Sequence, residues 1–177
     1  MEVWKVVYNS PVLFDQSETI VESFTVRQDR RKLLIISAVS KDTDIIKPFI
    51  YDINGLKEYE LIEMNDELQY EIISEILGHQ KMGTQLYISA KWDDAVTIFT
   101  AAIEAGFSKD EIQTLISGEK RRYVYCLKCY HLQEVEAEET DTICHHCQIS
   151  LEIGPFFSRE RKGYIGYPYN PAFVPTT

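Results

Sequence analysis

Four cysteines are the residues of this sequence whose type and spacing most directly suggest chemistry. They form two Cys-x-x-Cys pairs, Cys126 with Cys129 and Cys144 with Cys147, with fourteen residues between the pairs. Each short turn directs two sulfurs toward one point, and two such turns on facing hairpins complete a tetrahedron of thiolates. Zinc suits four soft thiolates, and four protein ligands leave no position for water. The spacing therefore predicts a structural zinc ion in a zinc ribbon.

Iron held as in rubredoxin is the alternative, because iron also accepts four thiolates. Rubredoxin-like turns usually carry glycine after the second cysteine, so that backbone N–H groups can reach sulfur. Here Tyr130 and Gln148 stand at those positions, which favours zinc. Because four thiolates already satisfy the ion, we expect the nearby histidines to lie outside the ligand set, and a more distant one to be a surface residue: His131, His145 and His146, then His79.

The residues before the ribbon have patterns typical of an α/β fold. Lys32–Val39 is a continuous apolar run, which suits a strand buried on both faces, and Tyr59–Met64 and Thr84–Ala90 are two further strand candidates. Asp66–Gly78 and Trp92–Gly106 have helical periodicity and alternate with these strands. The alternation predicts a three-layer α/β domain with a small parallel sheet, followed by the four-cysteine ribbon.

Other segments give expectations that rest on shorter patterns. Trp4–Tyr8 and Thr19–Val26 are rich in β-branched and aromatic residues and are predicted strands. Ser108 and Glu111 form a capping-box pattern, which predicts a short helix ending near Gly118. Arg121–Tyr125 is predicted to be the first ribbon strand, and the proline content of Gly163–Thr177 disfavours helix and central strand alike. The apolar stripe predicted for the helix at 66–78 consists of Leu68, Ile72, Ile76 and Leu77.

Domain boundaries follow from these patterns: an α/β domain at 1–118, a ribbon at 119–155 and an aromatic, proline-rich segment at 156–177. Residues 1–118 carry 11 basic and 20 acidic side chains, a net charge of −9, which argues against a nucleic-acid partner. The sequence has no signal-peptide pattern at its start, and its longest clean apolar run, Leu33–Ile36, is far short of a membrane span. We expect a cytoplasmic protein with no membrane partner.

Nucleotide-binding motifs are absent from the sequence: no Gly-x-Gly-x-x-Gly follows a strand, and there is no Walker-type loop. The run from Gly83 to Trp92 resembles the late strand of ferredoxin–NADP reductase domains, which ends in Cys-Gly-Pro beside the nicotinamide. In this chain the strand ends in Ser89-Ala90-Lys91. The likeness implies a degenerate reductase-like domain, and we expect no tight binding of NAD(P)H or FMN.

Three blocks of the sequence resemble one family. The first is Gln80–Thr84 with Leu86-Tyr87-Ile88, and the second is Glu104–Ser108 with Glu111-Ile112. The third is the ribbon followed by Phe157-Ser158-Arg159 and Tyr164-Ile165-Gly166-Tyr167. Together they look like the small zinc-ribbon subunit of bacterial dimethylamine monooxygenase and its relatives, over roughly residues 80–167. The family pattern has histidine at Phe156 and a second arginine at Glu160.

This resemblance implies an accessory, non-catalytic subunit of a multi-component oxygenase that oxidatively demethylates a small amine such as dimethylamine. Haem, flavin and nicotinamide would then be bound by the catalytic partner subunits and not by this chain. Two alternatives stay open: a stand-alone zinc-ribbon adaptor that binds another protein, and a flavin or nicotinamide reductase domain.

Aromatic and basic residues after the ribbon are the candidates for binding a partner. Such side chains are enriched at interface cores, and arginines can pair with a partner's carboxylates. An alternative is that some of the rings pack back on the protein. The predicted contact residues are Phe157, Arg159, Arg161, Tyr164 and Tyr167.

Overall fold

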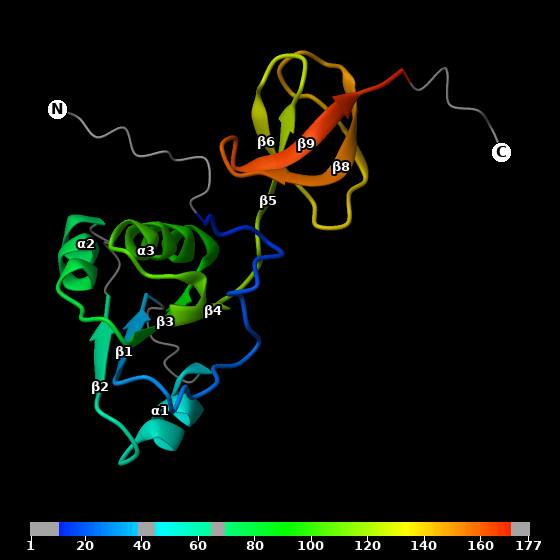
Figure 1. Cartoon of the computed structure of the whole chain (residues 1–177). Helices are drawn as coiled ribbons and strands as arrows, with labels where there is room; N and C mark the ends of the chain where they lie inside the picture. The colour runs from blue at the N-terminus through cyan, green and yellow to red at the C-terminus, as the bar shows by residue number, and fades with distance from the viewer. Residues whose placement is uncertain (1–10, 39–44, 65–69, 171–177) are drawn as a thin grey trace, which may run out of the picture. The chain divides into compact units, whose positions relative to one another are not determined.

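The computed structural model describes residues 11–38, 45–64 and 70–170. The chain divides into two compact units, an α/β unit at Pro11–Glu119 and a ribbon unit that begins at Lys120. The α/β unit contains a four-stranded sheet, and the ribbon unit contains a five-stranded sheet (Figure 1).

A fully parallel sheet forms the centre of the α/β unit, as predicted. Its strands are β1 (Lys32–Ser37), β2 (Tyr59–Glu63), β3 (Thr84–Ala90) and β4 (Ile112–Ile116), in the order β2-β1-β3-β4. Every residue of β3 is buried, as are the last five of β1. Because both strands are covered on two faces, β1 is apolar without alternation from Leu33 to Ile36, and even the polar residues of β3, Thr84, Gln85 and Ser89, are buried.

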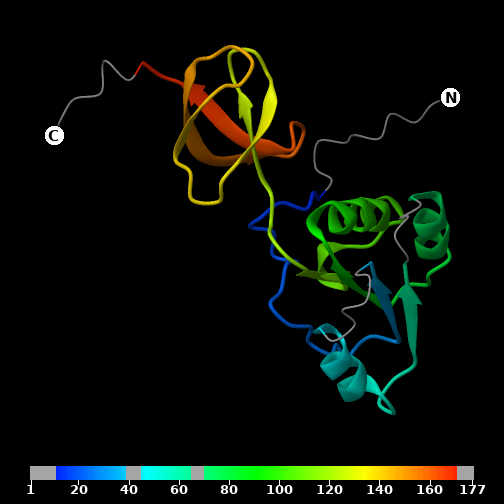
Figure 2. The same cartoon turned by 180° about the vertical axis from the view of Figure 1, so that it is seen from behind.

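Helices cover both faces of this sheet, which confirms the predicted three layers (Figures 1 and 2). α1 (Lys47–Ile53) lies on one face, and α2 (Tyr70–Gly78) and α3 (Trp92–Glu104) lie together on the other. α3 is the predicted helix, and it buries one side that includes Ala95, Ile98 and Phe99. In the described part of the chain, no helix is long and apolar enough to cross a bilayer.

The apolar stripe predicted for α2 is partly wrong. The buried side chains are Ile73 and Leu77, four residues apart, whereas Ile72 is 44% exposed. Leu68, the first predicted member of the stripe, lies outside the described residues. The helix is therefore rotated relative to the predicted face.

The helix predicted after Ser108 is also wrong. The capping box is present, since the backbone N–H and hydroxyl of Ser108 both donate to the carboxylate of Glu111. It begins only the three-residue 3-10 helix η3 (Lys109–Glu111), which leads directly into β4. β-Branched residues of β4 pair along the exposed edge of β3, and this tertiary pairing outweighs the local helical signal.

The predicted strand at Thr19–Val26 does not form. Ile20 makes an isolated parallel bridge with Thr114, and the chain then leaves the sheet edge. Phe24 instead packs edge-on against Phe49 of α1 and Tyr87 of β3, with ring centroids 5.2 Å apart in both pairs. Phe24 and Val26 thus cover the sheet face that carries α1, whereas Ile20 packs against the core on the opposite face. The other N-terminal prediction, Trp4–Tyr8, lies outside the described residues.

The Tyr87 hydroxyl links this N-terminal segment to the sheet by hydrogen bonds. Replacing Tyr87 with phenylalanine should lower the free energy of unfolding of the α/β unit by about 1–2 kcal/mol. The side chain is fully buried, its hydroxyl donates to the Thr25 carbonyl at 3.1 Å, and it accepts from the Arg27 N–H at 3.2 Å. Burial raises the pKa of Tyr87 above its ordinary value of 10.0. The folded state thus favours the neutral phenol, so this stability is present below pH ~10 and is lost as the pH rises further.

Urea unfolding of both proteins near neutral pH and above pH ~10 checks this. The stability difference between wild type and Tyr87→Phe should shrink at alkaline pH, because only wild type loses the Tyr87 contribution. A difference that stays constant with pH would contradict the assignment.

The ribbon unit is a strongly curled sheet of five strands. They are β5 (Arg122–Cys126), β6 (Leu132–Val135), β7 (Asp141–Ile143), β8 (Ser150–Ser158) and β9 (Gly163–Pro168), in the order β6-β5-β9-β8-β7. β5 and β9 are parallel, and the other neighbours are antiparallel. The expected strand at 121–125 is present, shifted by one residue.

β9 corrects the prediction that Gly163–Thr177 contains no central strand. It lies between β5 and β8, and Pro168 is its last residue, where a missing N–H costs the ladder least. Gly166 makes the close packing possible, because a Cβ there would lie 2.8 Å from Val124 Cγ1 and 3.0 Å from the Tyr125 carbonyl oxygen. Residues 156–158 and 163–168 are thus part of the ribbon sheet.

Candidate metal centre

Two turns of the ribbon carry the cysteines and have the same backbone pattern. The first knuckle (Cys126–His131) joins β5 to β6, and the second knuckle (Cys144–Ile149) joins β7 to β8. In each, the first cysteine N–H donates to the carbonyl five residues later, at 2.9 Å in both knuckles. In each, the residue after the second cysteine donates its N–H back to the first cysteine carbonyl, at 2.7 and 2.9 Å. Because the backbone hydrogen bonds repeat, each knuckle holds its two thiols in the same local geometry.

Tyr130 and Gln148 adopt the left-handed backbone conformation that glycine usually supplies in such turns. Their φ angles are 61° and 57°. A non-glycine residue in this region costs roughly 1–2 kcal/mol, so both knuckles are held in a strained shape by the hydrogen bonds around them. The absence of glycine therefore does not prevent the knuckle fold, and it does not separate zinc from iron as the sequence suggested.

The four thiols converge as a tetrahedral ion requires. All four sulfurs lie within 4.8 Å of one another, with Cys126 to Cys147 at 3.8 Å and Cys129 to Cys144 at 3.5 Å. A tetrahedral ion with bonds of about 2.3 Å to sulfur needs sulfur–sulfur separations of about 3.8 Å. No disulfide links the cysteines. The donor set therefore fits one metal ion with four thiolate ligands.

Backbone hydrogen bonds and the closeness of the thiols give Cys144 and Cys129 different pKa values. Burial disfavours the Cys144 thiolate, but hydrogen bonds from the N–H groups of Cys147 and His146 outweigh it and lower the pKa to about 7. At Cys129, a hydrogen bond from the His131 N–H favours the thiolate, yet burial and the neighbouring thiols raise the pKa to about 12. Four thiolates in so small a space need a bound cation to offset their charge.

One family model of known proteins matches the ribbon unit. Residues 123–167 match the family model described as dimethylamine monooxygenase subunit DmmA-like, C-terminal domain. The ribbon unit is related to this subunit family. The matched span runs from β5 into β9 and contains all four cysteines. No curated protein and no solved structure matches the chain.

The resemblance at residues 80–112 lies outside the DmmA-like span and stays a prediction. The degenerate reductase-like character of the α/β unit also stays a prediction. Its sheet does have the order of a doubly wound fold, with a switch point between β1 and β3. Ligands of such sheets bind at the carboxyl ends of the strands there, usually on a glycine-rich turn. The turn from β3 to α3 is the single residue Lys91, which offers no such turn.

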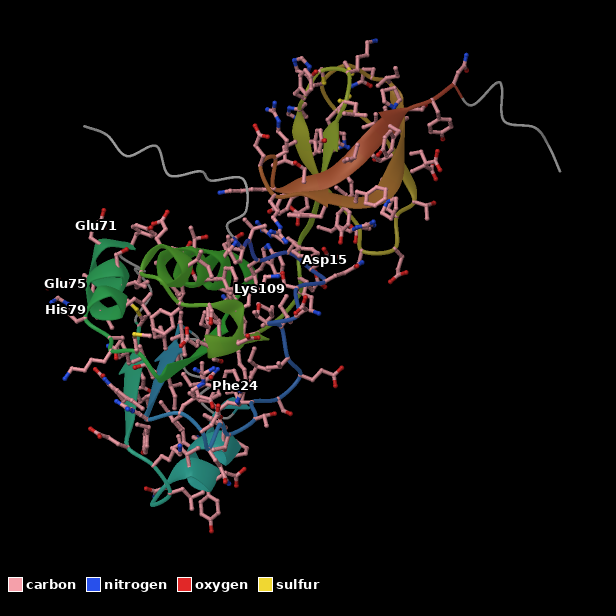
Figure 3. The ribbon with its side chains drawn as sticks, viewed as in Figure 1. Asp15, Phe24, Glu71, Glu75, His79 and Lys109 are labelled. Carbon is pink, nitrogen blue, oxygen red and sulfur yellow. The ribbon has the colours of Figure 1, made fainter. Side chains whose placement is uncertain are left out.

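The histidines lie outside the thiol cluster. His131 and His146 are exposed and stack on each other, with ring centroids 5.6 Å apart, and His145 is exposed beside them. The group of possible metal ligands in the described residues contains only the four cysteines. His79 is also exposed, as expected, on the outer side of α2 with Glu71 and Glu75 (Figure 3).

The predicted partner-binding residues are spread over different environments in the DmmA-like ribbon. Tyr164 is only 2% exposed and Phe157 packs edge-on against it at 5.4 Å, so Tyr164 belongs to the ribbon core and not to a docking surface. The Arg161 guanidinium lies over the exposed Tyr130 ring at 5.2 Å. Tyr167 is 38% exposed. Arg159 follows β8 in the turn to β9.

Arg122 is a supporting residue that the sequence analysis missed. Its Nη1 donates to the carbonyls of Ala137 and Glu139 at 3.0 and 2.8 Å, and its guanidinium covers the Tyr164 ring at 4.7 Å. It therefore fixes the acidic loop between β6 and β7 against the ribbon core. Only its place in the first ribbon strand could have suggested this, because a lone arginine before a cysteine pair has no distinctive spacing.

Proposed function

We propose that this chain is an accessory subunit of a multi-component amine monooxygenase, in which the ribbon holds a structural zinc ion and serves assembly. The observation that carries the proposal is the DmmA-like match over residues 123–167, which covers the complete four-thiol cluster. The substrate class proposed is a small methylated amine such as dimethylamine. Haem, flavin and nicotinamide belong to the catalytic partner subunits. The complex lies in the cytoplasm, where reducing conditions keep the thiols of this chain available for metal.

Zinc supplies rigidity at this site, and no step of the reaction passes through it. Four thiolates occupy every position of a tetrahedral ion, so neither water nor substrate has a coordination site. What the chain contributes is a stiff surface, because the ion joins two knuckles that carry exposed side chains. Such pre-organisation lowers the ordering cost of docking.

The exposed residues around the first knuckle are the best candidates for partner contact. Leu127, Tyr130 and Leu132 are 37%, 60% and 40% exposed, an unusual density of apolar surface for one short turn. Arg161 adds a positive charge over Tyr130. We retain Phe157, Arg159, Arg161 and Tyr167 from the predicted set, and Tyr130 takes the place of the buried Tyr164.

Co-purification tests the proposed function directly. Full-length tagged protein from native cells should elute with a chain whose visible spectrum shows haem or flavin, and the eluted complex should convert dimethylamine with a nicotinamide as reductant. Elution with a partner that lacks both cofactors would support the stand-alone adaptor instead. A flavin spectrum from the chain alone would support a reductase.

Reversing the charge of Arg161 should weaken this assembly by tenfold or more if the residue is an interface hot spot. Arg161→Glu removes the cation from the Tyr130 ring, a contact worth about 0.5–1 kcal/mol at an exposed site, so the ribbon should stay folded. The measurement is the amount of cofactor-bearing partner recovered per tagged chain.

Arg121→Glu is the matched control. Arg121 is an exposed ribbon arginine whose ion pair with Glu134, at 3.4 Å, lies on the surface. The same charge reversal there should leave partner recovery near the wild-type level. Equal losses for the two variants would mean that net charge, and not the Arg161 contact, controls assembly.

A further inference from the structure

Gln133 is a buried polar side chain that connects one half of the ribbon to the other. It lies in β6 and is only 5% exposed, while its neighbours along the strand, Leu132 and Glu134, face solvent. Its Oε1 accepts a hydrogen bond from the His145 N–H at 2.9 Å. Its Nε2 donates to the Ile143 carbonyl at 3.1 Å. One side chain thus satisfies backbone groups on both sides of Cys144.

The position of Gln133 in the sheet explains why a side chain makes these bonds. β6 and β7 are the two edges of the five-stranded ribbon sheet, and they share no backbone ladder. The curl of the sheet brings the edges together, and Gln133 Nε2 also lies 3.5 Å from Thr142 Oγ1 of β7. The amide therefore bridges the hairpin with the first knuckle to the hairpin with the second.

We propose that Gln133 is a positioning residue for the metal centre, which holds the second knuckle so that Cys144 and Cys147 face the thiols of the first. This inference rests on the structural metal of the proposed function. Without the amide, the His145 N–H and the Ile143 carbonyl lose their partners in a partly buried place, which favours other conformations of the knuckle. Binding the metal must then also reorder the knuckle, and the free-energy cost of this reordering lowers the net affinity for the metal. Groups that orient metal ligands are typically worth 10–100-fold in metal affinity.

The test compares three variants of the full chain by competition for Zn²⁺ with a chromophoric chelator. Gln133→Met keeps the side-chain volume and removes both hydrogen bonds, whereas Gln133→Ala also leaves a cavity. Glu134→Gln is the matched control, because this neighbouring side chain faces solvent and its ion pair with Arg121 lies on the surface. Two further readouts are the visible absorption of the Co²⁺-loaded proteins and the hydrogen exchange of the His145 amide in the Zn²⁺-loaded state.

We expect Gln133→Met and Gln133→Ala to bind Zn²⁺ at least tenfold more weakly than wild type, with faster exchange at His145 and an altered Co²⁺ spectrum. Glu134→Gln should match wild type in all three. Wild-type affinity in Gln133→Met would overturn the proposal and leave Gln133 a space-filling residue, even if Gln133→Ala fails to fold. A wild-type chain that binds no metal would instead refute the metal centre itself, which separates the two failures.

Discussion

Replacing Cys144 with serine is expected to release the metal ion and unfold the ribbon unit. The Cys144 thiol is fully buried, and the variant leaves three thiolates and a weak hydroxyl ligand around the ion. Structural zinc contributes an apparent ~10–16 kcal/mol in small zinc-binding peptides, which is comparable to the ~5–15 kcal/mol total stability of most domains. Elemental analysis should fall from about one zinc per chain to near zero, and limited proteolysis should cut within residues 120–168.

Ile143→Ser is the control for this experiment. It introduces the same side chain at the adjacent position, where the isoleucine is 55% exposed and contributes no metal ligand. The control should keep its zinc and resist proteolysis. Full zinc content in Cys144→Ser would contradict the four-thiolate site, and stoichiometric iron in wild type would replace zinc as the resident metal.

A chain that ends at Gly154 should lose the ribbon fold completely. The truncation removes part of β8 and all of β9, so β5 loses its neighbour in the centre of the sheet. It also removes Tyr164, whose ring fills the core beneath Arg122. A two-stranded hairpin is at best marginally stable alone, so neither remaining hairpin should persist. Amide exchange of β5 residues should approach the unprotected rate.

The truncation has its own control, a chain that ends at Asn170. That chain keeps all five ribbon strands and should bind zinc and protect the β5 amides like wild type. If the chain ending at Gly154 still bound zinc with a cooperative melt, β9 would be dispensable, and the residues after it would again be candidates for a separate docking segment.

Features with strong, self-contained signals could be predicted from the sequence. The continuous apolar run of β1 is visible because both faces of the strand are buried, β3 has the apolar centre Leu86-Tyr87-Ile88, and α3 shows its period over thirteen residues. The two knuckles were predictable because a Cys-x-x-Cys turn fixes both its ligands and its local shape. The convergence of the thiols follows from two such turns on adjacent hairpins.

The features that were missed depend on contacts between distant residues. A capping box at Ser108 precedes β4 and suggests a helix, whereas the strand conformation of β4 comes from its pairing with β3. β9 ends in proline and contains two glycines, so its composition indicates a loop, while its place between β5 and β8 requires those glycines. Gln133 gives no sequence signal, because a buried amide cannot be distinguished from an exposed one by its spacing.

The parallel pairing of β5 with β9 also sets the order in which the ribbon can be completed during synthesis. Val124 pairs with Tyr164, forty positions later in the chain. At about 5–20 residues per second, the ribosome needs about 2–8 s to make this interval. All four cysteines are made within it, so the set of thiols is complete before the centre of the sheet can form. β9 then enters last, and neither hairpin is stable on its own until β9 pairs with both β5 and β8.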